Sequence, residues 1–319
     1  MHISFRQLFT AVLFTWLAVV ITPANAAKEV PYLLTVVSKG DLTTVNAMLA
    51  SGASANAQDE DGVTALMYAA RKGNVDVVLA LLEKGGDINA KDHGGWTPLM
   101  YAAKKNQVEV VKVLLDKGAD PHVRDGYGWS AFGLAAVSGF SQTVDLMIKH
   151  GVDVNTKSDD GKSVLMHAAK SGDLATVTIL LDNKADMSLQ DSLGATALMV
   201  AARGGHAAVV ELMAKRGAVV DQKDFSKWTA LTWAVKKSQL DAARMLIIAG
   251  ADVNHKDDEG TPIIHLAVDN GNADMVKLLL ENNVNVKAKD QYGLTALVYA
   301  LKGHKPEIAK MIKDAGGSY

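Results

Sequence analysis

The chain contains no cysteine, and this absence excludes several kinds of chemistry at once. Disulfide bonds, thiolate metal sites, thiol nucleophiles and lipid attachment through cysteine all need a thiol. Aromatic residues are scarce at 6% of the chain, and neither sign of charge dominates, since the formal net charge is -2 over 319 residues. The sequence is therefore neither a disordered chain nor a generally basic nucleic-acid binder. Its stability must come from apolar packing.

Motifs of catalysis and of cofactor binding are missing as well. The sequence has no Gly-x-Gly-x-x-Gly, no phosphate loop and no Gly-x-Ser-x-Gly. Its histidines are scattered, without the i, i+4 pairing of a helical metal site. Acidic clusters at 59–61 and 257–259 could hold calcium, but they lack the loop spacing of a dedicated site and lie where turns are ordinarily acidic. We predict no enzyme, no catalytic residue, no metal ligand and no cofactor.

Long apolar runs are absent except at the N-terminus. There Arg6 precedes an apolar stretch over 8–21, and Pro23 leads to Ala24-Asn25-Ala26. A positive start, a short apolar stretch and an A-x-A site are the parts of a secretory signal peptide. The stretch is shorter than the roughly 20 residues of a membrane-spanning helix, which argues against an uncleaved anchor. We predict cleavage after Ala26 and export to a bacterial periplasm, or secretion, with no membrane span in the mature chain.

The rest of the chain repeats itself every 33 residues. One column holds threonine or serine, with proline once: Thr64, Thr97, Ser130, Ser163, Thr196, Thr229, Pro262 and Thr295. A second column, two residues earlier, is glycine in every unit except at Lys227: Gly62, Gly95, Gly128, Gly161, Gly194, Gly260 and Gly293. Such a fixed period is typical of a solenoid built from one stacked unit.

The unit that begins at Asp92 shows what each column does. Asp92 and the glycine three residues later favour a turn. Thr97 can cap a helix whose first residue is Pro98. Small and apolar residues then follow with helical spacing, and a second apolar stripe runs until Gly118 ends it. Each unit is thus a turn and two antiparallel helices, which bury their apolar faces only when neighbours stack.

These letters resemble the ankyrin repeat family, whose 33-residue period and T-P-L-H-x-A signature match "TPLMYAA" at Thr97, while "GADVNHKD" at Gly250 is a second close match. The resemblance implies an all-α solenoid of helix-turn-helix units with β-turn fingers, about nine units including caps. We expect a single array over 27–319: an N-terminal cap unit at 27–58, seven internal units over 59–289 and a C-terminal cap unit at 290–319. Methionine replaces the usual histidine of the family at four positions, which predicts a reduced inner hydrogen-bond network.

Function then depends on residues that vary between units. In the resembled family, partners contact the turn tips and the ends of the first helices, which line a concave groove. Basic residues gather at those helix ends against one acid, Asp269, and we call them the basic stripe: Lys39, Arg71, Lys72, Lys104, Lys105, Lys170, Arg203, Lys236, Lys237 and Lys302. Cations at a helix C-terminus also complement the helix dipole, which is the alternative explanation.

Aromatic residues mark two candidate patches beside this stripe. The first patch is Trp96, Lys104, Lys105, Tyr127 and Trp129, with Arg71 and Lys72 one unit earlier. The second patch is Phe225, Trp228, Trp233, Lys236 and Lys237. Aromatic side chains beside lysine or arginine are typical of interface hot spots. Packing between neighbouring turns is the other interpretation of these aromatic residues.

The sequence therefore predicts a non-enzymatic protein-binding scaffold. Its expected partner is another exported protein with an acidic or mixed surface, bound by a monomer through the groove. The alternative is a carrier of a small ligand or cofactor, such as heme, on an aromatic patch, because histidine and methionine are plentiful. Nucleic acid is not an expected partner, because an exported protein does not meet it.

Overall fold

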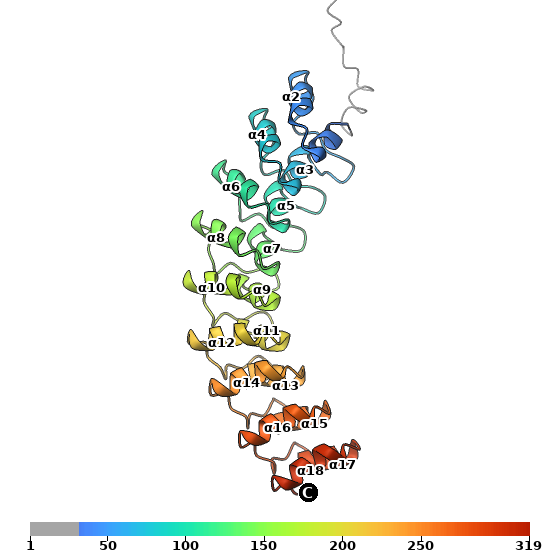
Figure 1. Cartoon of the computed structure of the whole chain (residues 1–319), viewed down its shortest axis with the longest axis vertical. Helices are drawn as coiled ribbons and strands as arrows, with labels where there is room; N and C mark the ends of the chain where they lie inside the picture. The colour runs from blue at the N-terminus through green and yellow to red at the C-terminus, as the bar shows by residue number, and fades with distance from the viewer. Residues whose placement is uncertain (1–31) are drawn as a thin grey trace, which may run out of the picture.

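A computed structural model describes residues 32–319 as an elongated, curved stack of helix pairs (Figure 1). The first helices of the units, after a helical segment at 32–39, are α3 (Ala65–Lys72), α5 (Pro98–Lys104), α7 (Ala131–Val137), α9 (Val164–Ser171), α11 (Ala197–Gly204), α13 (Ala230–Lys236), α15 (Ile263–Asp269) and α17 (Ala296–Lys302). The second helices are α2 (Leu42–Ala50), α4 (Val75–Glu83), α6 (Val108–Asp116), α8 (Ser141–Lys149), α10 (Leu174–Asp182), α12 (Ala207–Lys215), α14 (Leu240–Ile248), α16 (Ala273–Glu281) and α18 (Pro306–Asp314).

The predicted caps set where the helices begin. Thr97 Oγ1 accepts a hydrogen bond from the Met100 N–H at 3.3 Å, and Pro98 occupies the first turn of α5. The glycine of the preceding turn, Gly95, has a left-handed φ of 83°. Lys227 takes the same place with a φ of 55°, and its N–H donates to the Asp224 carbonyl at 2.9 Å as glycine does elsewhere. Lys227 therefore keeps the turn geometry of the glycine column.

First helices pack on first helices and second helices on second helices, so two layers run the length of the array. The first helices line the inner side of its curve (Figure 1). Alanines such as Ala102 and Ala103 are fully buried between layers, because their small side chains let neighbouring helices approach closely. The core is thus one continuous strip, as a solenoid requires.

Methionine does more than fill space at the position where the family has histidine. The sulfur of Met67 accepts a hydrogen bond from the Thr64 N–H at 3.3 Å, and Met199 does the same for Thr196 at 3.4 Å. The expected loss of inner hydrogen bonds is therefore only partial. A thioether is a weak acceptor, but here it still satisfies the backbone of the cap residue.

Neighbouring units are joined by hydrogen bonds as well as by apolar contact. The His93 N–H donates to the Asp61 carbonyl at 3.0 Å, which links two successive turn tips. On the loop after the second helix, Asn89 Oδ1 accepts from the Asp120 N–H, 31 residues later, at 2.9 Å. Asn56, Asn155, Asp221 and Asn254 repeat this bond. These bonds fix the register between units.

The ends of the array differ from its middle. Lys310 and Lys313 on α18 are exposed, so the last unit presents a polar face. The predicted signal peptide, 1–26, lies outside the described residues. Over 32–319, the search for a helix both long enough and apolar enough to cross a bilayer finds none.

Candidate functional site

Each turn led by an aspartate is held together by that residue's carboxylate. Asp125 Oδ1 accepts hydrogen bonds from the N–H groups of Tyr127 at 2.9 Å and Trp129 at 2.8 Å. This local bonding fixes the turn and leaves its tip in solvent. The Tyr127 side chain is accordingly 83% exposed, and Phe225, on another tip, is 74% exposed. Among the aromatic residues of the two predicted patches, these two have side chains exposed to solvent.

The tryptophans, in contrast, are half-buried against neighbouring rings. Trp96 lies 5.2 Å from the Tyr101 ring centroid, and Trp228 lies 4.6 Å from Trp233 in an edge-to-face arrangement. Trp129 packs on the His167 ring of the next unit at 4.5 Å. These tryptophans therefore build the wall of the inner face as well as part of its surface.

A second oxygen of the turn aspartate binds an aromatic side chain nine residues later. Tyr101 Oη donates to Asp92 Oδ2 at 2.7 Å, and Trp233 Nε1 donates to Asp224 Oδ2 at 2.9 Å. Tyr68 and Tyr299 repeat the bond with their own aspartates. The hydrogen bond to the Asp290 carboxylate, followed by burial, raises the pKa of Tyr299 to about 12. Of these aromatic residues only Trp233 was predicted as a patch residue, and its hydrogen bond to Asp224 was not predicted.

The basic stripe is exposed and carries no ion pair. Over residues 32–319, none of its side chains has a carboxylate within salt-bridge distance, whereas lysines of the second helices do, as in Lys112–Asp116 and Lys215–Glu211. Two arginines of the stripe stack on rings: Arg71 lies 4.8 Å from the Tyr68 centroid, and Arg203 lies 5.3 Å from that of Trp233. The stripe thus leaves positive charge uncompensated on one face.

The two predicted patches form two rows rather than compact clusters. Trp96 and Trp228 come just before a first helix and the lysines at its end, so a helix of seven residues such as α5 separates them by about 10 Å. Trp233 is the exception, because it lies in the middle of α13. Lys104 bonds Ser138 of the next unit at 3.2 Å instead of an aromatic ring. Lys72, Lys105, Lys236 and Lys237 are exposed in the same row. The cation that meets Trp233 is Arg203 of the preceding unit.

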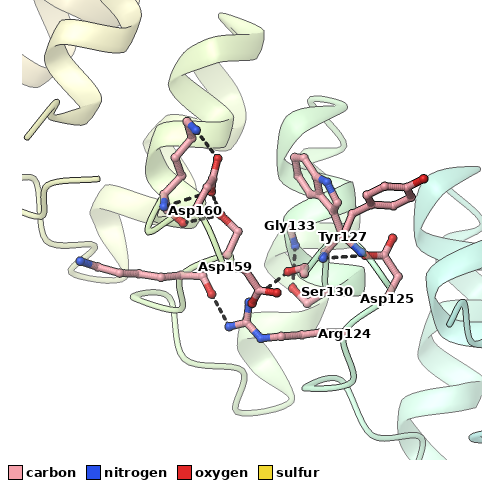
Figure 2. A network of polar contacts seen from close by, with 12 residues as sticks. Arg124, Asp125, Tyr127, Ser130, Gly133, Asp159 and Asp160 are labelled. Atoms are coloured by element: carbon pink, nitrogen blue, oxygen red, sulfur yellow. Dashed lines mark hydrogen bonds and ion pairs between the residues drawn. The ribbon is translucent and has the colours of Figure 1, made fainter. Parts of the chain in front are cut away.

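A polar network between two turns lies behind the first patch (Figure 2). Arg124 bonds the Gly128 carbonyl of its own turn at 3.0 Å, and reaches Asp159 of the next turn at 3.4 Å. Burial opposes the ionisation of Asp160, but hydrogen bonds from Lys162 and the neighbouring serine outweigh it and lower the pKa of Asp160 to about 2. In this network Arg124 pairs with Asp159 and Lys162 pairs with Asp160. These pairs hold the two turns in place.

Half-way along the same face, a pocket of about 290 Å³ opens between α9, α11 and α13. It is lined by Lys170, Val200, Arg203 and Trp233 from the helices and by Leu193 from a turn tip. Only Trp233 belongs to the predicted patches. The sequence offers no specific signal for it, because the unit led by Asp257 also has no ring at the positions equivalent to Ala195 and Val200.

Of the residues that suggested heme, four methionines are core residues. Met67, Met100, Met166 and Met199 are each at most 2% exposed. Within 32–319, no three histidine, aspartate or glutamate side chains gather as a metal site requires. The acidic clusters at 59–61 and 257–259 therefore do not form such a group. The chemistry offered by the inner face is therefore recognition through charge, rings and one pocket.

Comparison with known proteins agrees with this architecture. A family profile described as ankyrin repeats (3 copies) matches residues 33–125, 117–191, 165–257 and 245–318. A search of curated proteins finds no match. The matches to the family profile cover nearly all of the described chain, and such repeats are typically binding modules rather than enzymes. The chain belongs to the ankyrin repeat family.

Proposed function

We propose that this ankyrin repeat protein is a non-enzymatic scaffold that is exported and binds another exported protein through the inner face of its curve. The observation that carries the proposal is the separation of charges. Acids and bases pair within several second helices, whereas over residues 32–319 the cations of the basic stripe have no carboxylate partner. A row of unpaired positive charge beside exposed rings favours a partner with an acidic or mixed surface.

Helix dipoles do not account for the whole stripe. A dipole favours one cation in the last turn of a helix by about 0.3–1 kcal/mol. Second helices have the same dipole, yet α10, α14 and α16 have no basic residue in their last turn or at their C-cap. Basic residues are doubled at Arg71-Lys72, Lys104-Lys105 and Lys236-Lys237. The excess on the inner face therefore supports recognition.

The test is capture of a partner by the mature chain, beginning at Ala27, from an extract of exported proteins. The K104E/K105E variant should lose the partner, because it reverses two charges of the basic stripe. The matched control is K84E/K117E, which reverses two exposed charges at the ends of second helices. Equal capture by K104E/K105E and the parent would contradict a binding role for the stripe.

Export has its own test. The N-terminal signal predicts that the intact chain, expressed in a bacterium, accumulates outside the cytoplasm with Ala27 as its first residue. Fractionation and N-terminal sequencing measure both. Retention of the uncleaved chain in the cytoplasm would remove the exported partner from the proposal, while the protein-binding face would remain.

A further inference from the structure

The pocket on the inner face lies in a unit that has no ring at two positions where the next unit carries tryptophan. In the unit led by Asp191, the fourth position after the aspartate is Ala195 and the ninth is Val200. The next unit has Trp228 and Trp233 at these positions, and their rings pack together at 4.6 Å. Ala195 and Val200 are too small to fill the space beside Trp233, and the 290 Å³ pocket lies at that point.

The same unit leaves a hydrogen-bond acceptor unused. Asp191 Oδ1 accepts from the N–H groups of Leu193 and Ala195, each at 2.9 Å. Its Oδ2 receives no hydrogen bond from any residue between 32 and 319, because Val200 cannot donate where Tyr101 and Trp233 do. Asp191 is only 8% exposed and lines the pocket. Asp191 Oδ2 can therefore accept a hydrogen bond from a donor that enters the pocket.

The surroundings of the pocket specify more of its occupant. Lys170 and Arg203 stand at its edge, exposed and without a carboxylate partner. On the opposite side, Leu193 is 68% exposed and is tied to the neighbouring tip by the bond from the Phe225 N–H to its carbonyl, 3.1 Å long. An apolar rim, a hydrogen-bond acceptor and two cations without a carboxylate partner thus surround a space of about 290 Å³, which is large enough for one aromatic side chain.

We propose that this pocket receives a tyrosine or tryptophan side chain from an acidic segment of the partner protein, a proposal that rests on the protein-binding function above. The ring lies in the space that the missing aromatic residues leave, and its O–H or N–H donates to Asp191 Oδ2. Carboxylates on either side of it in the partner meet Lys170 and Arg203. The partner completes the stack with the side chain that the chain's own unit lacks.

Synthetic peptides test the chemistry directly. The probe is acetyl-Glu-Asp-Tyr-Asp-Glu-amide, and the comparisons are its phenylalanine counterpart and a tyrosine peptide flanked by lysines. We expect the acidic tyrosine peptide to bind at least tenfold more tightly than either, because only it supplies both donor and charge. Binding is measured through the methyl NMR signals of Met166 and Met199, which line the pocket, with those of Met100 and Met147 as remote references.

Two variants separate the pocket from the rest of the face. Val200→Tyr supplies the missing ring from the chain itself and should abolish peptide binding while the protein stays folded by circular dichroism. Leu266→Tyr makes the same change at the equivalent position two units later and should leave binding unchanged. Should Val200→Tyr fail to fold, Ala195→Trp fills the other vacant position and takes its place.

The outcomes are distinct from those of the partner-capture test. Equal affinity of the tyrosine and phenylalanine peptides, unchanged binding to Val200→Tyr, or no binding of the acidic tyrosine peptide at about 1 mM would each overturn the pocket proposal. A partner that the K104E/K105E variant loses but Val200→Tyr retains would overturn it too, while leaving the scaffold function intact. The pocket proposal is supported if Val200→Tyr loses this partner and Leu266→Tyr retains it.

Discussion

The aspartate at the head of each turn has two tasks, one for each carboxylate oxygen. Oδ1 closes the turn through backbone N–H groups, and Oδ2 fastens the turn to the first helix when a tyrosine or tryptophan stands nine residues later. The consequence is that one side-chain column decides whether a unit is closed or open on the inner face. Tyr101 closes its unit, whereas Val200 leaves its unit open.

The Tyr101→Phe substitution should lower the free energy of unfolding by about 1–2 kcal/mol, because it removes a hydrogen bond to a charged group and leaves Asp92 Oδ2 without a donor. Urea denaturation followed by circular dichroism measures the change. Tyr127→Phe is the control, since that hydroxyl is at an exposed tip without a hydrogen bond to 32–319. Equal effects of the two substitutions would show that the Asp92 bond contributes nothing.

His167 predicts a specific response to acid. Burial is the main reason that its pKa falls from 6.5 to about 4. The unfolded chain therefore binds a proton more readily than the folded one, so stability is lost as the pH falls from 6.5 through 4 and is present above 6.5. The lost free energy approaches about 3 kcal/mol at the acid end.

The His167→Leu variant, which copies the residue of the equivalent position at Leu134, should lose less stability than the parent between pH 7 and about 4. The difference between the two urea midpoints over this pH range isolates the histidine from the carboxylates that titrate in both proteins. His122→Leu, on an exposed loop, should behave like the parent. Parallel pH profiles for the parent and His167→Leu would refute the assignment.

At the scale of the element, the sequence placed most helices because caps and glycines are local signals. Thr97, Pro98 and Gly118 mark where helices start and stop through bonds to their own neighbours in the chain. The sequence did not indicate that Lys227 takes the place of glycine. A non-glycine residue can adopt a left-handed φ when the surrounding structure holds it there. Local signals therefore predict where a helix begins and ends. Whether a turn accepts a residue other than glycine depends on its packing against neighbouring units.

The loop asparagines predict how strongly successive units are coupled. Asn89→Ala should lower stability by about 1 kcal/mol, because the Asp120 N–H loses its acceptor. Asn89→Asp should keep most of this stability, since Asp221 fills the same role four units later in the array. Amide hydrogen exchange at Asp120 measures the coupling. Faster exchange in both variants alike would contradict an acceptor role for the side chain.

At the scale of the molecule, the 33-residue period was enough to predict the array and its two layers. The site was predictable only in part. The basic stripe could be read from the sequence because its members share one position in each unit, and the structure leaves them unpaired. The pocket could not, because it depends on two small residues, Ala195 and Val200, meeting the rings of a neighbouring unit in space.

The last unit should act as a cap for the whole array. Deleting 290–319 exposes apolar residues of α15 and α16, among them Leu266 and Leu279, and we expect the shortened chain to self-associate in light scattering. Adding Leu280→Lys, at the position that Lys313 occupies in α18, should restore part of the monomer. A monomeric deletion mutant would show that α17 and α18 are not needed as a cap.

The bonds between units also determine how the molecule would bear a pull on its two ends. Each unit contacts only its neighbours, so the load passes through every interface in series and the weakest one opens first. An opened unit of 33 residues lengthens the chain by about 110 Å. The protein would therefore extend in equal steps, with one unit unfolding at each step.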